Sequence, residues 1–161
     1  MHVRLARPAD LERLGEITVA AYADFTHGPD DTYVARLRDT AARADQAELW
    51  VAVHDDGRLL GSVTNCPPGS PWREIARDDE GEFRMLAVDP SVRRTGAGRA
   101  LVEHVEERWR AAGATGIALS SLADMTAAHA LYARLGFTRD PTRDWSPHDG
   151  VDLLAFTKAL R

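Results

Sequence analysis

Arginines and glycines gather in one short segment of the sequence. Arg93, Arg94 and Arg99 fall within seven residues, with Gly96 and Gly98 among them. A strand-like run comes before this segment and a helical pattern follows it. The start of a helix carries unpaired N–H groups and about half a positive charge, and glycine lets a ligand approach the backbone closely. The segment therefore favours a site for a phosphate-bearing ligand, although a glycine that merely caps an amphipathic helix would give a similar pattern.

Two common phosphate-binding patterns do not fit this segment. A P-loop needs Gly-x-x-x-x-Gly-Lys followed by Ser or Thr, and no such string occurs. A dinucleotide-binding fingerprint needs a third glycine where Leu101 stands, and an acidic residue near the position of Leu119. The pattern that remains is Arg-x-x-Gly-x-Gly, residues 93–98.

The elements that position this segment follow from hydrophobic periodicity and from turn residues. A helix is expected to start at Pro8–Asp10, and others cover residues 32–44, 98–112 (ended by Gly113) and 126–135. Strands are expected over residues 2–5, 48–53, 59–64, 82–88, 116–121, 137–139 and 151–159, and polar loops over 67–72 and 144–147. This order predicts an α/β (α+β) fold, a single domain over residues 1–161 with a mixed central sheet of about six to seven strands flanked by about four helices.

Composition excludes several classes of protein. The net charge of −5 argues against broad nucleic-acid binding, and no apolar run approaches the roughly 20 residues of a membrane span. We therefore expect a cytoplasmic protein with no membrane or nucleic-acid partner. The lone Cys66 excludes an internal disulfide, and the six histidines lack ligand spacing, so we expect no metal. A nucleophilic role for Cys66 would need a histidine partner that the sequence does not indicate.

Two longer strings point to a family. Residues 86–101, L-A-V-D-P-x-x-R-R-x-G-x-G-x-x-L, resemble the acetyl-CoA-binding motif of the GCN5-related N-acetyltransferases, the GNAT family. Residues 130–137, A-L-Y-A-R-L-G-F, are similar to the second signature of that family. The resemblance extends over nearly the whole chain, because the hairpin before the first string and the strand after it also match the family's order of elements.

The resemblance implies that the cosubstrate is acetyl-CoA and that it lies along the strand and the loop. The strand backbone would pair with pantetheine, and the loop N–H groups would hold the pyrophosphate. The cofactor-binding residues are then Leu86, Ala87, Val88, Arg93, Arg94, Thr95, Gly96, Ala97, Gly98 and Arg99. The family often has asparagine where Met125 stands, and the resemblance leaves His129 as the residue of that helix that would contact pantetheine instead.

The resemblance also implies two catalytic residues. Tyr132 would lie near the thioester sulfur and donate a hydrogen bond to the leaving thiolate. Glu82 is the candidate general base, with an ion pair to Arg84 as its alternative role and with Asp79 and Glu80 as weaker substitutes. A base is needed because an amine with a pKa of about 10.4 is neutral only about four times in ten thousand at pH 7, a deficit worth about 4.6 kcal/mol.

The acceptor side is less well defined by the sequence. Tyr22, Phe25, Trp72 and Trp145 lie in segments that would border the acceptor and are the candidate substrate-binding residues, although core or dimer contacts would also explain them. The expected reaction transfers acetyl to a primary amine of a small molecule or peptide by direct attack in a ternary complex. The rivals are a non-catalytic acyl-CoA sensor on the same fold and a nucleotide-phosphate binder. A homodimer is possible by analogy with other proteins of this fold.

Overall fold

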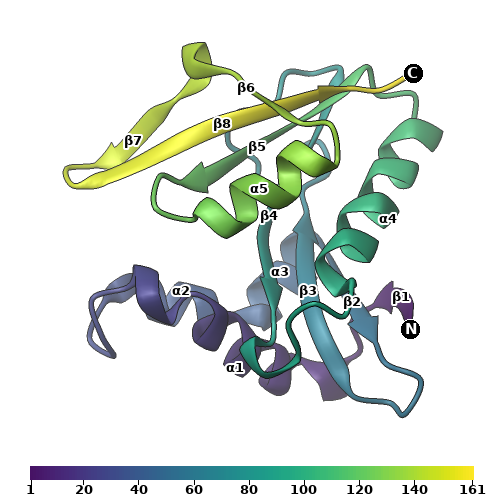
Figure 1. Ribbon diagram of the computed structural model, residues 1–161, viewed down its shortest axis with the longest axis vertical. Coiled ribbons are helices and arrows are strands. Elements are labelled where there is room, and N and C mark those ends of the chain that lie inside the picture. The colour runs from purple at the N-terminus through teal and green to yellow at the C-terminus, as the bar shows by residue number, and fades with distance from the viewer.

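The computed structural model describes residues 1–161, whose strands form one sheet (Figure 1). The order is β1-β2-β3-β4-β5-β8-β6, with β7 paired to β8. Only β4 and β5 pair in parallel. The predicted mixed sheet is therefore confirmed. The strands are β1 His2–Leu5, β2 Glu48–Val53, β3 Leu59–Asn65, β4 Glu80–Val88, β5 Gly116–Leu122, β6 Thr138–Arg139, β7 Trp145–His148 and β8 Val151–Ala159.

Five α-helices pack on this sheet. They are α1 Leu11–Ala21, α2 Thr32–Arg38, α3 Thr40–Gln46, α4 Ala97–Ala111 and α5 Thr126–Arg134. In Figure 1 the helices α1 to α3 lie with β1 to β3 in the lower part of the molecule, and α5 lies with β5 to β8 in the upper part. None of these helices has the length and apolar character needed to cross a membrane.

The single helix expected over residues 32–44 is wrong, because Asp39 divides it into α2 and α3. The Asp39 carboxylate accepts a hydrogen bond from the Ala42 N–H at 3.1 Å and so caps α3. Short polar side chains compete with a continuing helix by offering the backbone such a cap. The apolar periodicity of this stretch continues through the break, so the sequence pattern does not indicate that the helix is divided.

The loop expected over residues 144–147 is also wrong, because residues 145–147 form most of β7. Trp145 lies opposite Leu153, and His148 lies opposite Val151. Serine and proline in the segment are typical of loops, but proline is tolerated in a strand at the edge of a sheet. Seven strands form the main path of the sheet, as the expected count of about six to seven allows, and β7 pairs with β8 beside that path as the eighth strand.

Strands β4 and β5 diverge after three paired residues, which opens the sheet in its middle. Glu80, Gly81 and Glu82 pair with residues 116–118 of β5, and beyond them β5 pairs only with β8. The register of β4 against β3 shifts near Met85, whose φ of 51° marks a bulge. Figure 1 shows the two strands running in different directions. The backbone of 83–88 therefore has a strand neighbour on one side only.

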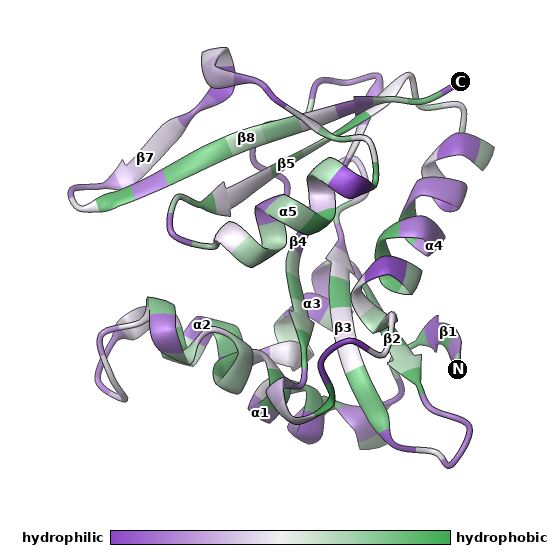
Figure 2. Cartoon of the chain, in the orientation of Figure 1, coloured by the Kyte–Doolittle hydropathy of each residue, from purple (hydrophilic) through white to green (hydrophobic).

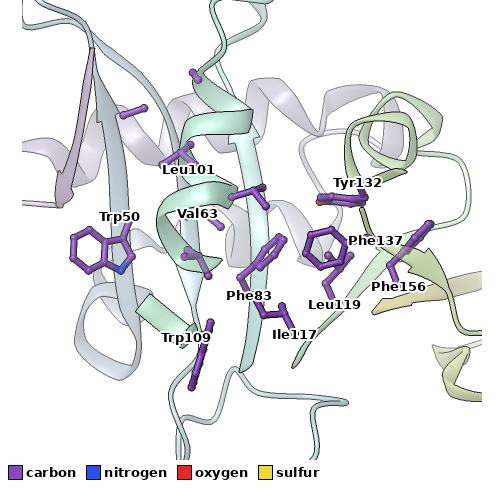
Figure 3. Packing of buried hydrophobic residues seen from close by; sticks show 14 of the residues in the cluster. Trp50, Val63, Phe83, Leu101, Trp109, Ile117, Leu119, Tyr132, Phe137 and Phe156 are labelled. Atoms are coloured by element: carbon purple, nitrogen blue, oxygen red, sulfur yellow. The ribbon is translucent and has the colours of Figure 1, made fainter. Parts of the chain in front are cut away.

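Buried side chains of the core hold α4 and α5 on either side of this opening. Leu101, Val102 and Val105 of α4 are fully buried against the sheet, and polar residues cover its outer face (Figure 2). On the other side, Phe83, Tyr132, Phe137 and Phe156 form an aromatic cluster (Figure 3). Burying a large apolar side chain stabilises a fold by about 1.5–3 kcal/mol, so both helices are held firmly at the edges of the opening.

Candidate active site

The arginine and glycine segment forms the expected helix start. Helix α4 begins at Ala97, directly after Gly96, whose φ of 83° is the left-handed conformation that glycine adopts without strain. No turn, loop, cap or side-chain acceptor in the structure receives a hydrogen bond from the N–H groups of residues 94–99. These donors therefore remain available to an anion at the positive end of a 15-residue helix.

Two arginine side chains next to these donors form no ion pair or hydrogen bond within the protein. The exposed side chains of Arg93 and Arg94 take part in no ion pair or hydrogen bond within the protein, whereas Arg99 pairs with Glu103 at 2.7 Å. Free guanidinium groups next to a helix N-terminus are suited to charge-assisted hydrogen bonds with phosphate oxygens. The predicted phosphate-binding residues are thus brought together, with Arg99 partly engaged elsewhere.

Gly98 joins this helix start to the opening between β4 and β5. A Cβ atom at this position would lie 3.3 Å from Cδ2 of Leu131 and 3.5 Å from Cγ2 of Val88. The absence of a side chain lets the first turn of α4 approach the end of β4 and helix α5. The predicted strand residues Leu86, Ala87 and Val88 run directly into this junction.

A cavity of about 560 Å³ fills the opening. Residues 83–86 of β4 and 119–122 of β5 line its two sides, and Tyr132 of α5 borders it. Tyr22 and Phe25, from the end of α1 and the following turn, and Trp145 of β7 also line it. The structure therefore places three of the four predicted acceptor residues at one cavity beside Tyr132.

Trp72, the fourth predicted acceptor residue, does not line the cavity. Its side chain is buried in a cluster with Leu37 and Cys66, and its Nε1 donates a hydrogen bond to Oε1 of Gln46 at 2.9 Å. The proline-rich loop folds back onto the end of α3, where Ser70 Oγ also donates to the Gln46 carbonyl oxygen. Trp72 is a packing residue because this loop turns its indole inward.

Tyr132 presents a hydrogen-bond donor at the cavity. Its ring packs between Phe83 and Phe156, with ring centroids 6.0 and 5.8 Å away, and its hydroxyl makes no hydrogen bond within the protein (Figure 3). Burial raises the pKa of Tyr132 above its usual value of about 10. The hydroxyl therefore stays protonated at neutral pH and is free to donate.

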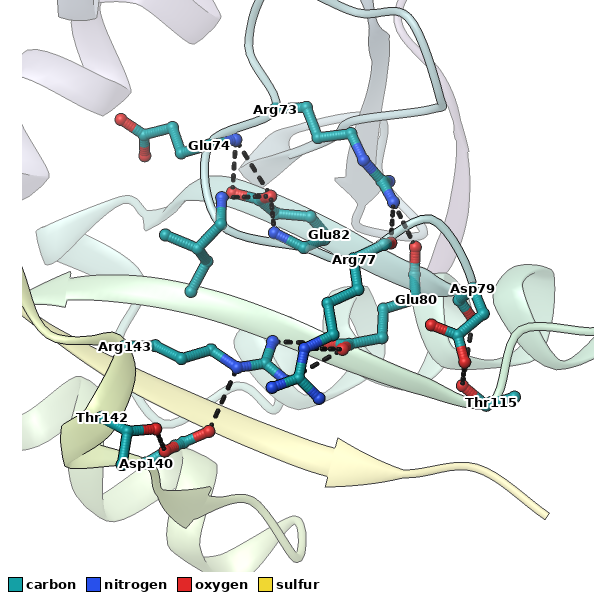
Figure 4. Close-up of polar contacts among 12 residues, drawn as sticks. Arg73, Glu74, Arg77, Asp79, Glu80, Glu82, Thr115, Asp140, Thr142 and Arg143 are labelled. Atoms are coloured by element: carbon teal, nitrogen blue, oxygen red, sulfur yellow. Dashed lines mark hydrogen bonds and ion pairs between the residues drawn. The ribbon is translucent and has the colours of Figure 1, made fainter.

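Glu82 occupies a different setting from the one expected of a base. Its carboxylate is fully buried and accepts hydrogen bonds of 2.9–3.0 Å from the backbone N–H groups of Glu74, Ile75 and Ala76 (Figure 4). It does not line the cavity. The strand pattern places Glu82 on a face of β4, but it does not reveal that residues 74–76 fold across this face and occupy its oxygens.

The two substitutes proposed for Glu82 are engaged as well. Glu80 forms a bidentate pair with Arg143, with N–O distances of 2.7 and 2.9 Å, and Asp79 accepts from Thr115 Oγ1 at 2.8 Å (Figure 4). Neither residue lines the cavity. Both therefore act as structural contacts at the N-terminal end of β4.

Glu74 is a carboxylate that lines the cavity and that sequence reasoning missed. It lies 2.8 Å from Nε of Arg84, and both residues line the cavity. Burial raises the pKa of Glu74, and the nearby Arg84 guanidinium opposes that shift. No motif contains Glu74, so only its place between Trp72 and the strand could have drawn attention to it.

The helix that carries Tyr132 is tied to β5 by His129. The Nε2 atom of His129 lies 3.1 Å from Ser121 Oγ and 3.0 Å from the Leu122 carbonyl oxygen, and burial lowers its pKa. His129 is therefore engaged with β5, which argues against its suggested contact with pantetheine. Met125, which replaces the family's asparagine, lines the cavity.

Cys66 lies outside the cavity and is fully buried. Burial raises the pKa of its thiol to about 12. Since the thiolate is the nucleophilic form, Cys66 is unsuited to carry an acyl group at neutral pH.

Comparison with known proteins places the chain in a family. The model of the Acetyltransferase (GNAT) family matches residues 11–137, which is most of the chain. The chain belongs to the acetyltransferase (GNAT) family. Among solved structures, the PaiA N-acetyltransferase of Thermoplasma acidophilum in complex with coenzyme A has a TM-score of 0.73 at 17% identity, covering 99% of this chain and 98% of that one. YncA of Salmonella typhimurium with its cofactor acetyl-CoA has a TM-score of 0.68 at 22% identity, covering 100% and 94%.

Curated acetyltransferases also match this chain. A mycothiol acetyltransferase of Cellulomonas flavigena is 32% identical over 148 residues, which cover 83% of this chain and 42% of that protein. The chain therefore spans less than half the length of this relative. The resemblance read from residues 86–101 and 130–137 is confirmed at the level of the family.

Proposed function

We propose that this GNAT protein transfers the acetyl group of acetyl-CoA to a primary amine of a small molecule or peptide. The observation that carries the proposal is the continuity of three features. A set of N–H donors that have no acceptor within the protein, at the start of α4, leads through Gly98 to a strand with one free side. That strand borders a cavity with a tyrosine hydroxyl.

The donor would lie along this path. The N–H groups of residues 94–99, with Arg93 and Arg94, suit a pyrophosphate, and the free edge of Leu86–Val88 suits the amide groups of pantetheine. The PaiA structure contains coenzyme A and the YncA structure contains acetyl-CoA, which supports the same choice here. Acetyl-CoA supplies an activated acyl carbon, and the protein orients that carbon toward the cavity.

The residues at the cavity suit direct attack by the amine. Tyr132 would donate a hydrogen bond to the sulfur as negative charge develops on it. Complete proton transfer from tyrosine to a thiolate is uphill by about 2 kcal/mol for reference pKa values of about 10 and 8.5, and burial of Tyr132 increases this difference. A hydrogen bond, rather than full protonation, is therefore the role that we assign to Tyr132.

A direct test follows thiol release from acetyl-CoA with a panel of amines, polyamines, amino acids and peptides. We expect release that depends on both substrates and intersecting lines in double-reciprocal plots, as a ternary complex requires. Calorimetry with coenzyme A, and with ATP and NAD for comparison, measures binding of the donor separately. Binding of acetyl-CoA without turnover on any amine would instead support the acyl-CoA sensor.

A further inference from the structure

We infer that Glu74 is the carboxylate that receives the proton of the acceptor amine, and that Glu82 is a positioning residue that holds Glu74 in place. This inference rests on the proposed acetyl transfer and names the residue that completes it. Glu74 replaces Glu82 in the role of base, because Glu74 lines the cavity whereas Glu82 does not.

Glu74 has the setting that this role requires. Its side chain is 17% exposed and lines the same cavity as Tyr132 and Leu86. Neither Asp79, Glu80 nor Glu82 reaches that cavity. The other two carboxylates that line it, Asp31 and Asp149, come from the start of α2 and from the β7–β8 turn. Asp31 accepts from the backbone N–H groups of His27 and Tyr33.

Glu82 fixes the backbone that carries Glu74. One oxygen, Oε1, accepts from the N–H groups of Glu74, Ile75 and Ala76 at 2.9–3.0 Å, and Oε2 accepts again from Glu74 at 3.0 Å. A fully buried carboxylate that accepts four hydrogen bonds from neighbouring N–H groups fixes the backbone of that loop. The loop would lose these acceptors if Glu82 were removed, and Glu74 would then lose its position.

The charges around Glu74 are balanced by residues from several elements. Arg84 of β4 lies 2.8 Å away and favours the ionised carboxylate, and burial favours the neutral one. The other groups that face it are Arg36 and Tyr33 of α2, Glu82 of β4 and Cys66 after β3. An ammonium ion would therefore meet a carboxylate whose pKa is raised by burial, which makes it a better proton acceptor than an exposed carboxylate.

The step balances with the reactants already named. An acceptor ammonium gives one proton to the Glu74 carboxylate, and the resulting amine nitrogen attacks the thioester carbon. The C–N bond forms, the C–S bond breaks, and the thiolate leaves with the hydrogen bond from Tyr132. The nitrogen loses its second proton as the amide forms, and the sulfur of coenzyme A gains one proton, so these two changes cancel. Glu74 then releases the first proton to solvent.

The test compares Glu74→Gln and Glu82→Gln with the wild-type protein across pH, using the amine that gives the fastest turnover. For Glu74→Gln we expect kcat/KM to fall by about 10²–10⁴-fold at pH 7, with the Kd for coenzyme A unchanged. The remaining rate should rise about tenfold per pH unit up to the amine pKa, so the gap to the wild type closes with rising pH. Glu74→Asp should restore part of the rate, and Glu12→Gln, at an exposed position of α1, is the matched control.

Glu82→Gln separates positioning from proton transfer. We expect it to lower Tm and kcat/KM. The acid limb of the wild-type pH profile, which is the fall in kcat/KM as Glu74 becomes protonated at low pH, should remain because Glu74 is still present. The inference is overturned if Glu74→Gln keeps that limb, or if Glu82→Gln alone removes it. Absence of turnover by the wild type with every amine would instead count against the proposed acetyl transfer, so the two failures are distinguishable.

Discussion

At the scale of single residues, the hydroxyl of Tyr132 gives the sharpest prediction. Tyr132→Phe should lower kcat by about a hundredfold, because one donor to the developing thiolate is lost. The Kd for coenzyme A, measured by calorimetry, should stay within about twofold, since no principal binding contact changes. Because the hydroxyl has no hydrogen-bond partner within the protein, Tm should change little. Turnover equal to that of the wild type would remove Tyr132 from the mechanism.

The two glutamates show which site residues the sequence could indicate. Tyr132 and the arginine–glycine segment belong to contiguous strings that resemble the signatures of the GNAT family, so a role could be predicted for them from the sequence. The relation between Glu74 and Glu82 depends on a loop that crosses β4, and a strand pattern contains no information about such a crossing. Trp72 lies outside the cavity for a similar reason, because the loop that carries it turns back onto α3.

At the scale of elements, the first turn of α4 should be intolerant of a charged side chain. Gly98→Asp should weaken coenzyme A binding by more than about a hundredfold, because a carboxylate would stand beside the expected pyrophosphate. Gly98→Ala adds only a Cβ, which meets Leu131 at 3.3 Å, and should cost far less. Calorimetry measures both variants, and circular dichroism checks that each is folded. Equal losses for alanine and aspartate would mean that packing, rather than charge, matters here.

The break between α2 and α3 depends on a cap that is also testable. Asp39→Ala removes the carboxylate that accepts from Ala42 N–H at 3.1 Å and should lower the free energy of unfolding by about 1 kcal/mol. Asp45→Ala, at an exposed position of the same helix, is the control and should change stability by less than about 0.5 kcal/mol. Urea unfolding followed by circular dichroism compares them. If both changes had the same effect, the cap would not explain the break.

At the scale of the whole molecule, the order of elements was predictable and the eighth strand was not. Seven strands carry an apolar pattern or lie next to clear turns, so their types and order follow from local signals. Strand β7 is short, contains Pro147 and borders solvent, and it exists because β8 offers an unpaired edge. The divergence of β4 and β5, which creates the cavity, likewise comes from pairing at a distance. A sequence motif can therefore indicate this opening only through resemblance to a family.

The whole fold should also lose stability in acid, and Asp10 offers a way to observe the cause. Its hydrogen bonds with Arg4 hold the pKa of Asp10 below its usual value. A lowered folded-state pKa contributes stability above the unfolded value of about 3.9, and this contribution is lost as pH falls through the folded pKa. Asp10→Asn should therefore lower Tm at pH 7, and the difference from the wild type should shrink as the pH falls below about 4. Thermal unfolding from pH 7 to pH 2.5 measures this, with exposed Asp78→Asn as control. A difference in Tm that persists unchanged at the lowest pH would show that Asp10 stabilises the fold by packing instead of charge.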